Sequence, residues 1–320
     1  MAVLGIDTSL YKTSCALADE QGRVVSSASR LLPVAQGALG LRQNDAVFLH
    51  VRQFPDMLSQ VLAQAEGYSI QAVAVSSRPS DAEGSYMPVF EMGRTLARAL
   101  ALAWQVPVVE TTHQRGHLRA AMIGTTGLPK RFLAVHLSGG TTDILLKEQD
   151  GSIALLAKGL DLHAGQLVDR VGVALGLFFP AGSQLDALAM SGTANGRYAV
   201  SLREGGFHLS GAETAALQDV KAGVLPKADI AANTLDVISR SLLRVLDAAA
   251  QAHAVCDVLI FGGVAASQWL RRHMQQRNLK RGYGLNLHFG LPEYSGDNAA
   301  GVALIGVEQQ TTEEPSWQKF

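Results

Sequence analysis

Two stretches of the chain share one pattern of apolar and polar residues. AVLGIDTSLYKTSCALADEQGRVVS lies near the start of the sequence, and FLAVHLSGGTTDILLKEQDGSIALL begins at Phe132. When the first stretch is shifted by 129 residues, the two align without a gap, with Leu4 on Leu133 and Gly22 on Gly151. Each stretch alternates as three short strands do, with small residues at the first turn and a glycine at the second. The match predicts a duplicated domain whose halves both begin with a β-meander.

Beyond each meander, stretches with helical spacing of apolar residues alternate with short apolar runs. In the first half this pattern predicts helices at 44–66 and 90–104, and strands at AVAVSS and VPVVETT. In the second half it predicts strands at DVLIFGG and LNLHFG, and helices at 164–176, 183–191, 228–253, 266–279 and 297–308. Residues 192–227 are rich in turn formers and weakly periodic, so we interpret them as an insertion.

These elements predict an α/β protein with two lobes, each a mixed β-sheet flanked by helices. We expect an N-terminal lobe at 1–112, a C-terminal lobe at 113–310 that carries the insertion, and a polar, loose tail at 311–320. Two such lobes on either side of a cleft resemble the duplicated actin, Hsp70 and sugar-kinase (ASKHA) fold. In that fold the first hairpin turn of each lobe points into the cleft and contacts phosphate.

The composition fits a soluble α/β protein, with 48% hydrophobic residues, 17% charged residues and a net charge of −1. This balance provides no overall positive field that would attract nucleic acid. Cys15 and Cys256 both lie in apolar runs, so we expect two buried, reduced thiols in a cytoplasmic protein. No apolar run reaches the ~18–20 residues of a membrane helix, and we expect no membrane partner.

Turns of small residues follow the first strand of each meander. HLSGGTTD at 136–143 is a good phosphate turn, because small residues let backbone N–H groups approach an anion and hydroxyls add donors. DTSLYKTS at 7–14 is poorer, because Leu10 and Tyr11 are bulky. Either turn alone is as typical of an ordinary hairpin, but two at matching places favour phosphate binding. The candidate contacts are Ser138, Gly139, Gly140 and Thr141.

A third glycine turn and a pair of histidines are further candidates. In IFGGVAAS at 260–267, Gly262 and Gly263 end a strand where a nucleotide base or ribose can approach, although a plain strand-to-helix turn has the same pattern. In VVETTHQRGHLRAA at 108–121, His113 and His117 stand four apart, which on a helix is one face. Such a pair can hold a metal ion or be two polar residues with no ligand. Gln114 replaces the glutamate base of a His-Glu-x-x-His protease.

Five motifs in order resemble those of one enzyme family. They are His-x-x-x-His at 113–117, LSGGTT at 137–142, GQLVDRVGVALGLFFPAGSQLDALA at 165–189, GGVAAS…LR at 262–271 and GDNAAG at 296–301. Over about residues 2–310 the chain resembles the threonylcarbamoyl-adenosine tRNA-modification transferases, or TsaD-like proteins, once labelled O-sialoglycoprotein endopeptidases. The resemblance implies a transferase and gives the old peptidase label no support.

The resemblance implies that His113, His117 and Asp297 bind one divalent metal ion, iron or zinc. From the residues alone, Asp297 is equally an N-terminal residue of a helix. His136 stands where archaeal and eukaryotic relatives have a tyrosine beside the metal. It is either a fourth ligand or a strand-end histidine bonded to the backbone, and we leave both readings open.

The resemblance also implies contacts with an adenine nucleotide or an acyl-adenylate. Ser138, Gly139 and Gly140 would face the phosphate. Asp169 and Asp186 would hold the ribose or base through charge-assisted hydrogen bonds, although two aspartates on a solvated helix face would look the same. The other residues implied to bind the nucleotide are Gly182, Gly262, Gly263 and Ser267.

The chain departs from the family pattern around the substrate. Tyr11 and Lys12 replace an acidic pair, and RPSDAEGSYMPVFEMG at 78–93 replaces a loop with Gly-Pro-Gly. FHLSGAET at 207–214 lacks the usual lysine and gains Glu213, while Ser267 replaces an asparagine. Reversed charge near the reacting centre should alter how a polyanionic substrate is held. We therefore expect a divergent paralogue that keeps the metal ligands.

We thus expect a metal-dependent threonylcarbamoyl or carbamoyl transferase that uses an acyl-adenylate donor and acts on tRNA adenosine next to the anticodon. The expected partners are tRNA and either a smaller paralogue with an ATPase subunit or a second copy of the chain. The alternatives are a non-catalytic scaffold subunit of a tRNA-modification complex and a kinase-like ATPase. The sequence indicates no general base.

Overall fold

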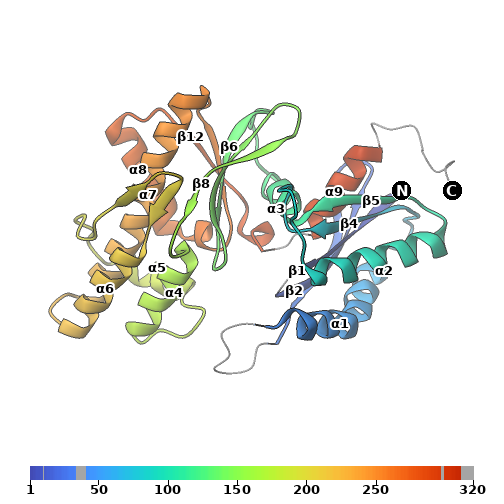
Figure 1. Cartoon of the computed structure of the whole chain (residues 1–320), viewed down its shortest axis with the longest axis horizontal. Helices are drawn as coiled ribbons and strands as arrows, with labels where there is room; N and C mark the ends of the chain where they lie inside the picture. Colours follow the sequence, from blue (N-terminus) through green and yellow to red (C-terminus); the bar gives the residue numbers. More distant parts are fainter. Residues whose placement is uncertain (10, 34–40, 297–298, 311–320) are drawn as a thin grey trace. The chain divides into compact units, whose positions relative to one another are not determined.

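The computed structural model describes residues 1–9, 11–33, 41–296 and 299–310. These residues form two compact units (Figure 1), one of Met1–Ile123 with the chain from Gly296 onward and the other of Gly124–Ser295. The units differ from the lobes expected at 1–112 and 113–310, because α3 (His113–Ala121) and α9 (Ala299–Gln310) pack together within the first unit. Asp297 and the tail at 311–320 lie outside the described residues.

The first unit is built on a sheet with the strand order β3-β2-β1-β4-β5. Its strands are β1 (Ala2–Ser9), β2 (Lys12–Asp19), β3 (Val24–Leu31), β4 (Ile70–Arg78) and β5 (Val108–Thr112). Leu4 and Ile6 pack on the side of α1 (Gln43–Ala63) and α2 (Pro88–Trp104), whereas Val3 packs on the side of α9. Because helices cover both faces of the sheet (Figure 1), the first five residues of β1 are a continuous apolar run and do not alternate with polar residues.

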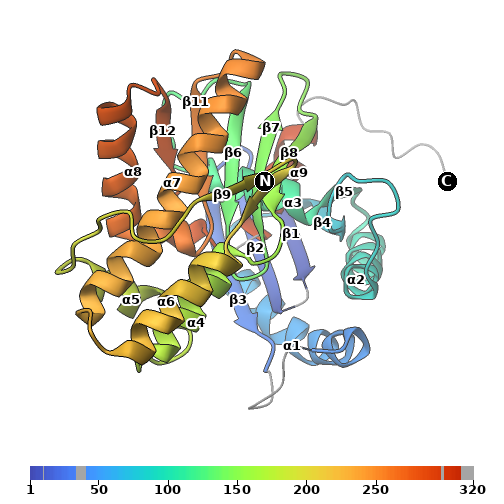
Figure 2. The same ribbon diagram turned by 60° about the vertical axis from the view of Figure 1, so that its left-hand side comes forward.

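The second unit is built on a sheet with the order β12-β11-β6-β7-β8-β10-β9. Its strands are β6 (Phe132–Leu137), β7 (Thr142–Lys147), β8 (Ile153–Gly159), β9 (Ser201–Arg203), β10 (Gly206–His208), β11 (Asp257–Phe261) and β12 (Asn286–Phe289). Its helices are α4 (Ala164–Ala174), α5 (Gly182–Ala189), α6 (Ser210–Ala222), α7 (Lys227–His253) and α8 (Gln268–Arg281), with 3₁₀ turns η1 (Val264–Ala266) and η2 (Pro292–Tyr294). The long helix α7 packs against α4, α5, α6 and α8 (Figure 2).

The strand registers match the repeat seen in the sequence. Leu4 pairs with Leu17 between β1 and β2, and Leu133 pairs with Leu146 between β6 and β7, so each partner is displaced by the same 129 residues. The order β5-β4-β1-β2-β3 also recurs as β12-β11-β6-β7-β8. The segment 192–227 adds β9, β10 and α6 to the second unit. Its strands have three residues each, too few to show a period.

Close packing of glycines fixes α3 against α9. A Cβ atom at Gly301 would lie 1.9 Å from the carbonyl oxygen of Gly116, so the two helices approach with no side chain between them. The ion pair of Arg119 with Glu308, at 2.6 Å, joins the same helices. The position of α3 on the sheet therefore depends on contacts with a helix far along the chain.

The expectation of two buried cysteines is wrong for one of them. Cys15 is buried in β2, whereas Cys256 is exposed because it lies in the short link between α7 and β11. Among the described residues, the helices are too short or too polar to cross a bilayer.

Candidate functional site

The two histidines lie where a strand runs directly into a helix. The side chain of Thr112, the last residue of β5, accepts a hydrogen bond from the backbone N–H of Arg115 at 3.2 Å and so caps α3. This cap starts the helix at His113 and places His117 one turn further along the same face. Their ring centroids are 4.6 Å apart with the planes at 68°. The sequence spacing therefore corresponds to real proximity.

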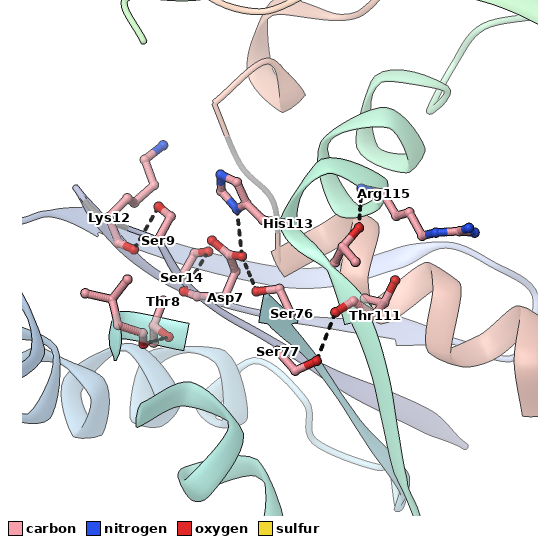
Figure 3. Close-up of polar contacts among 12 residues, drawn as sticks. Asp7, Thr8, Ser9, Lys12, Ser14, Ser76, Ser77, Thr111, His113 and Arg115 are labelled. Atoms are coloured by element: carbon pink, nitrogen blue, oxygen red, sulfur yellow. Dashed lines mark hydrogen bonds and ion pairs between the residues drawn. The ribbon is translucent and has the colours of Figure 1, made fainter. Parts of the chain in front are cut away.

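A buried carboxylate contacts the first histidine (Figure 3). Asp7 Oδ1 lies 2.9 Å from His113 Nδ1 and accepts a second hydrogen bond from the hydroxyl of Ser76. Asp7 lies near the end of β1 and Ser76 near the end of the neighbouring parallel strand β4, where Ile6 pairs with Val75. From the sequence, Asp7 was expected only as part of a phosphate turn, and Ser76 was not expected at the site. The available signal was that two adjacent parallel strands end in polar residues.

The donor set fits a metal ion of the iron or zinc type, because neutral imidazoles suit both. Asp297, the expected third ligand, lies outside the described residues. Within the described part of the chain, no group of three or more His, Cys, Asp or Glu residues is arranged to hold a metal ion. His136 belongs to the second unit, where it is buried and its ring stacks on Phe261 with centroids 4.8 Å apart. Ligation by these residues stays a prediction.

The turn between β6 and β7 is tightly bonded to the start of α4. The backbone N–H of Ser138 donates to the carbonyl of Thr141 at 2.8 Å, and that of Gly140 donates to Ser138 Oγ at 3.3 Å. The carbonyl of Ser138 accepts from Gly165 N–H at 3.1 Å. Open space surrounds the Cα atoms of Gly139 and Gly140 on the side where a Cβ would point. The turn is thus fixed on one side and accessible on the other, as a phosphate turn requires.

The expected nucleotide residues of α4, α5 and the third glycine turn are linked by hydrogen bonds. Asp169 accepts from the N–H of Ala181 at 2.8 Å, just before Gly182 begins α5. Burial raises the pKa of Asp169, and this hydrogen bond opposes the rise. Asp186 accepts from Ser267 Oγ and from the N–H groups of α8 residues 268 and 269, so it caps that helix. Their contacts with a nucleotide stay a prediction.

Residues at which we expected departures from the family pattern form ion pairs and hydrogen bonds of their own. Asp81, in the loop that we expected to replace Gly-Pro-Gly, pairs with Arg115 of α3 at 2.7 Å. Glu213 pairs with Arg170, the neighbour of Asp169, at 3.0 Å. Lys12 donates to the carbonyl of Gly296. Asp81, Glu213 and Lys12 therefore each make a polar contact within the fold, near α3, α4 and the first turn respectively.

Solved structures confirm the expected fold. Component A of the (R)-2-hydroxyglutaryl-CoA dehydratase of Acidaminococcus fermentans superposes with a TM-score of 0.59 at 18% identity, over 97% of this chain and 99% of that chain. A ROK family glucokinase from Streptomyces griseus gives a TM-score of 0.54 at 13% identity, over 95% and 99% of the two chains. At these identities the likeness shows the fold alone, the duplicated fold of sugar kinases.

Sequence comparison is more specific. The family model described as TsaD, tRNA N6-adenosine threonylcarbamoyltransferase, matches residues 40–304. Curated proteins of that name are 31% identical in Anaeromyxobacter sp. (strain Fw109-5), over 96% of this chain and 93% of the relative, and 32% identical in Synechococcus sp. (strain CC9902), over 96% and 90%. This chain therefore belongs to the tRNA N6-adenosine threonylcarbamoyltransferase family, a family of tRNA-modifying transferases, as its motifs predicted.

Proposed function

We propose that this protein transfers a threonylcarbamoyl or carbamoyl group from an acyl-adenylate to the N6 amine of a tRNA adenosine next to the anticodon. The observation that carries the proposal is the pair His113 and His117, adjacent on α3 in a chain of this transferase family. The relatives are named for the same group transfer to tRNA adenosine. The second unit supports the proposal with its open glycine turn at 138–141.

In the proposed reaction the N6 amine attacks the carbamoyl carbon of the donor. A C–N bond forms, the bond from that carbon to the phosphate oxygen breaks, AMP leaves with the electron pair, and the amine loses a proton to solvent. The turn at 138–140 would face the phosphate, with the backbone N–H of Gly139 as a donor, and Asp169 would accept a hydrogen bond from a ribose hydroxyl. His113, His117 and Asp297 would hold the metal ion, which supplies Lewis-acid polarisation of a carbonyl or phosphoryl oxygen. The remaining rate enhancement would come from the orientation of the two substrates and from electrostatic stabilisation of the transition state.

The departures from the family pattern indicate altered substrate handling. Lys12 brings a positive charge to the first turn, where the family has an acidic pair, and its ammonium group is held at Gly296, next to the expected ligand Asp297. A positive charge there would attract an anionic donor that an acidic pair would repel. We therefore propose a divergent transferase whose donor or acceptor differs in detail from that of its relatives.

The test is turnover with a defined donor. The purified protein is incubated with threonylcarbamoyl-adenylate and unmodified tRNA, alone and with a smaller paralogue and an ATPase subunit, and the digested nucleosides are identified by mass spectrometry. Threonylcarbamoyl-adenosine should form, and the double variant His113→Ala, His117→Ala should form none. No modified nucleoside with any partner set would contradict the proposal. ATP hydrolysis without transfer would favour a kinase-like ATPase, and complex assembly without bound metal would favour a scaffold.

A further inference from the structure

The carboxylate of Asp7 lies beside the first turn of α3, near the end of a central strand. Its Oδ1 atom is 2.9 Å from His113 Nδ1, and only 1% of the residue's surface is exposed to solvent. Figure 3 shows the other ring nitrogen of His113 on the side of the ring away from Asp7. A buried carboxylate is costly unless it accepts hydrogen bonds, so the burial of Asp7 favours keeping this contact.

We propose that Asp7 is a positioning residue that holds His113 with the proton on Nδ1 and leaves Nε2 as the nitrogen for a metal ion. An ionised carboxylate is an acceptor only, so a hydrogen bond between these atoms requires the proton on Nδ1. A metal-binding imidazole is neutral and carries one ring proton, so the lone pair is then on Nε2. The inference rests on the proposed function, in which His113 is a ligand.

Neighbouring groups make this arrangement rigid. The hydroxyl of Ser76 donates to the same carboxylate oxygen, which restrains Asp7 from the adjacent strand. The ring of His113 packs against those of Phe90, with centroids 5.4 Å apart, and His117. Bonded to a carboxylate and packed against two rings, the imidazole is preorganised before any ion binds, which lowers the entropic cost of binding. The bond to the carboxylate also favours His113 as a metal ligand.

The first test is the affinity of the full chain for Zn²⁺, measured by competition with a chromophoric chelator. Asp7→Asn keeps the size of the side chain and removes its charge, and it should weaken Zn²⁺ binding about tenfold to hundredfold. Asp19→Asn is the matched control, because Asp19 is also 1% exposed and lies at the opposite end of the same sheet, paired with Arg23. It should change the Zn²⁺ dissociation constant by less than about twofold. A merely structural role would lower Tm in both variants and leave both dissociation constants unchanged.

The second test determines the tautomer of the His113 imidazole in the metal-free protein. Long-range ¹H–¹⁵N NMR spectra of histidine-labelled protein distinguish the two neutral tautomers, with His113→Ala assigning the signal. The wild type should show the Nδ1–H tautomer at His113, and Asp7→Asn should shift the signal toward a mixture. This measurement also decides the matter if Asp7→Asn does not fold, because an Nε2–H tautomer in the wild type would overturn the inference.

The outcomes separate this inference from the proposed function. If Asp7→Asn binds Zn²⁺ with wild-type affinity while His113→Ala loses binding, Asp7 does not position the ligand and the metal site stands. If wild type and His113→Ala bind Zn²⁺ equally weakly, the metal site itself is wrong and the inference falls with it.

Discussion

Gly262 lies against the carbonyl oxygen of Leu137. A Cβ atom at Gly262 would be 2.3 Å from that oxygen, and the glycine has φ +100°, in the region that L side chains avoid. Leu137 leads into the turn at 138–141, and Gly262 leads into η1 and Ser267. The absence of a side chain at this point lets the two turns expected to contact the nucleotide start from adjacent strand ends.

Gly262→Ala should therefore lower the free energy of unfolding by about 2 kcal/mol or more, because the strained φ and the close carbonyl both oppose a methyl group. Gly263→Ala is the matched control, since Gly263 has φ −58° and no atom lies within 4 Å of the place where its methyl group would be. It should cost less than about 0.5 kcal/mol. Urea unfolding of the two full-length variants measures both changes in free energy, and equal losses would contradict the packing argument.

A buried aspartate of α7 joins two helices. Asp236 is fully buried and pairs with Arg240 of the same helix and Arg277 of α8, each at 2.6 Å. Asp236→Ala would leave the mostly buried guanidinium of Arg240 without this carboxylate, so it should cost about 3–5 kcal/mol. Glu213→Ala removes the partner of Arg170, which is 55% exposed, and should cost less than about 1 kcal/mol. Urea unfolding curves that rank the two variants in the reverse order would contradict this.

His50 of α1 should make the first unit less stable in mild acid. Its Nδ1 is 2.7 Å from Thr13 Oγ1 and its Nε2 is 2.8 Å from the carbonyl oxygen of Ser9, which fixes the ends of β1 and β2. Burial lowers the pKa of His50 below its usual 6.5, and the bond to Ser9 and the charge of Asp7 oppose the shift. Below pH 6.5 the unfolded chain therefore binds a proton at His50 more readily than the folded protein does. The free energy of unfolding therefore decreases as the pH is lowered.

The measurement is the free energy of unfolding between about pH 7.5 and 5.5, the range around an unperturbed histidine pKa. The wild type should lose stability as the pH falls, with a contribution from His50 of at most about 1.4 kcal/mol per pH unit. His50→Gln should be less stable at pH 7.5 and should lose less on acidification, because other groups titrate equally in both proteins. Parallel curves for the two proteins would refute a role for His50.

The repeat and the helix spacing could be predicted because they are local. The alternation of apolar and polar residues predicts which residues of a hairpin face each other. Leu133 therefore pairs with Leu146, as Leu4 pairs with Leu17 in the aligned stretch. The adjacency of His113 and His117 follows from one helical turn. The short strands β9 and β10 gave no period, and an apolar run around Cys256 did not reveal that its side chain is exposed.

The partners of the site residues could not be predicted, because they depend on which strands become neighbours. Asp7 and His113 are 106 residues apart, and they meet because β1 and β5 lie on either side of β4 and α3 begins directly after the end of β5. Asp186 was expected to hold a nucleotide, and its hydrogen bonds to the start of α8 appear only once α5 and α8 are packed together. Tertiary contacts, and not composition, decide such roles.

The most direct measurement of the central claim is a crystal structure of the purified full chain with anomalous scattering recorded at the iron and zinc absorption edges. We predict one ion about 2.0–2.2 Å from Nε2 of both His113 and His117, with a carboxylate oxygen of Asp297 as the third protein ligand. An ion bound elsewhere, or no ion between the two imidazoles after supplementation with both metals, would contradict the claim.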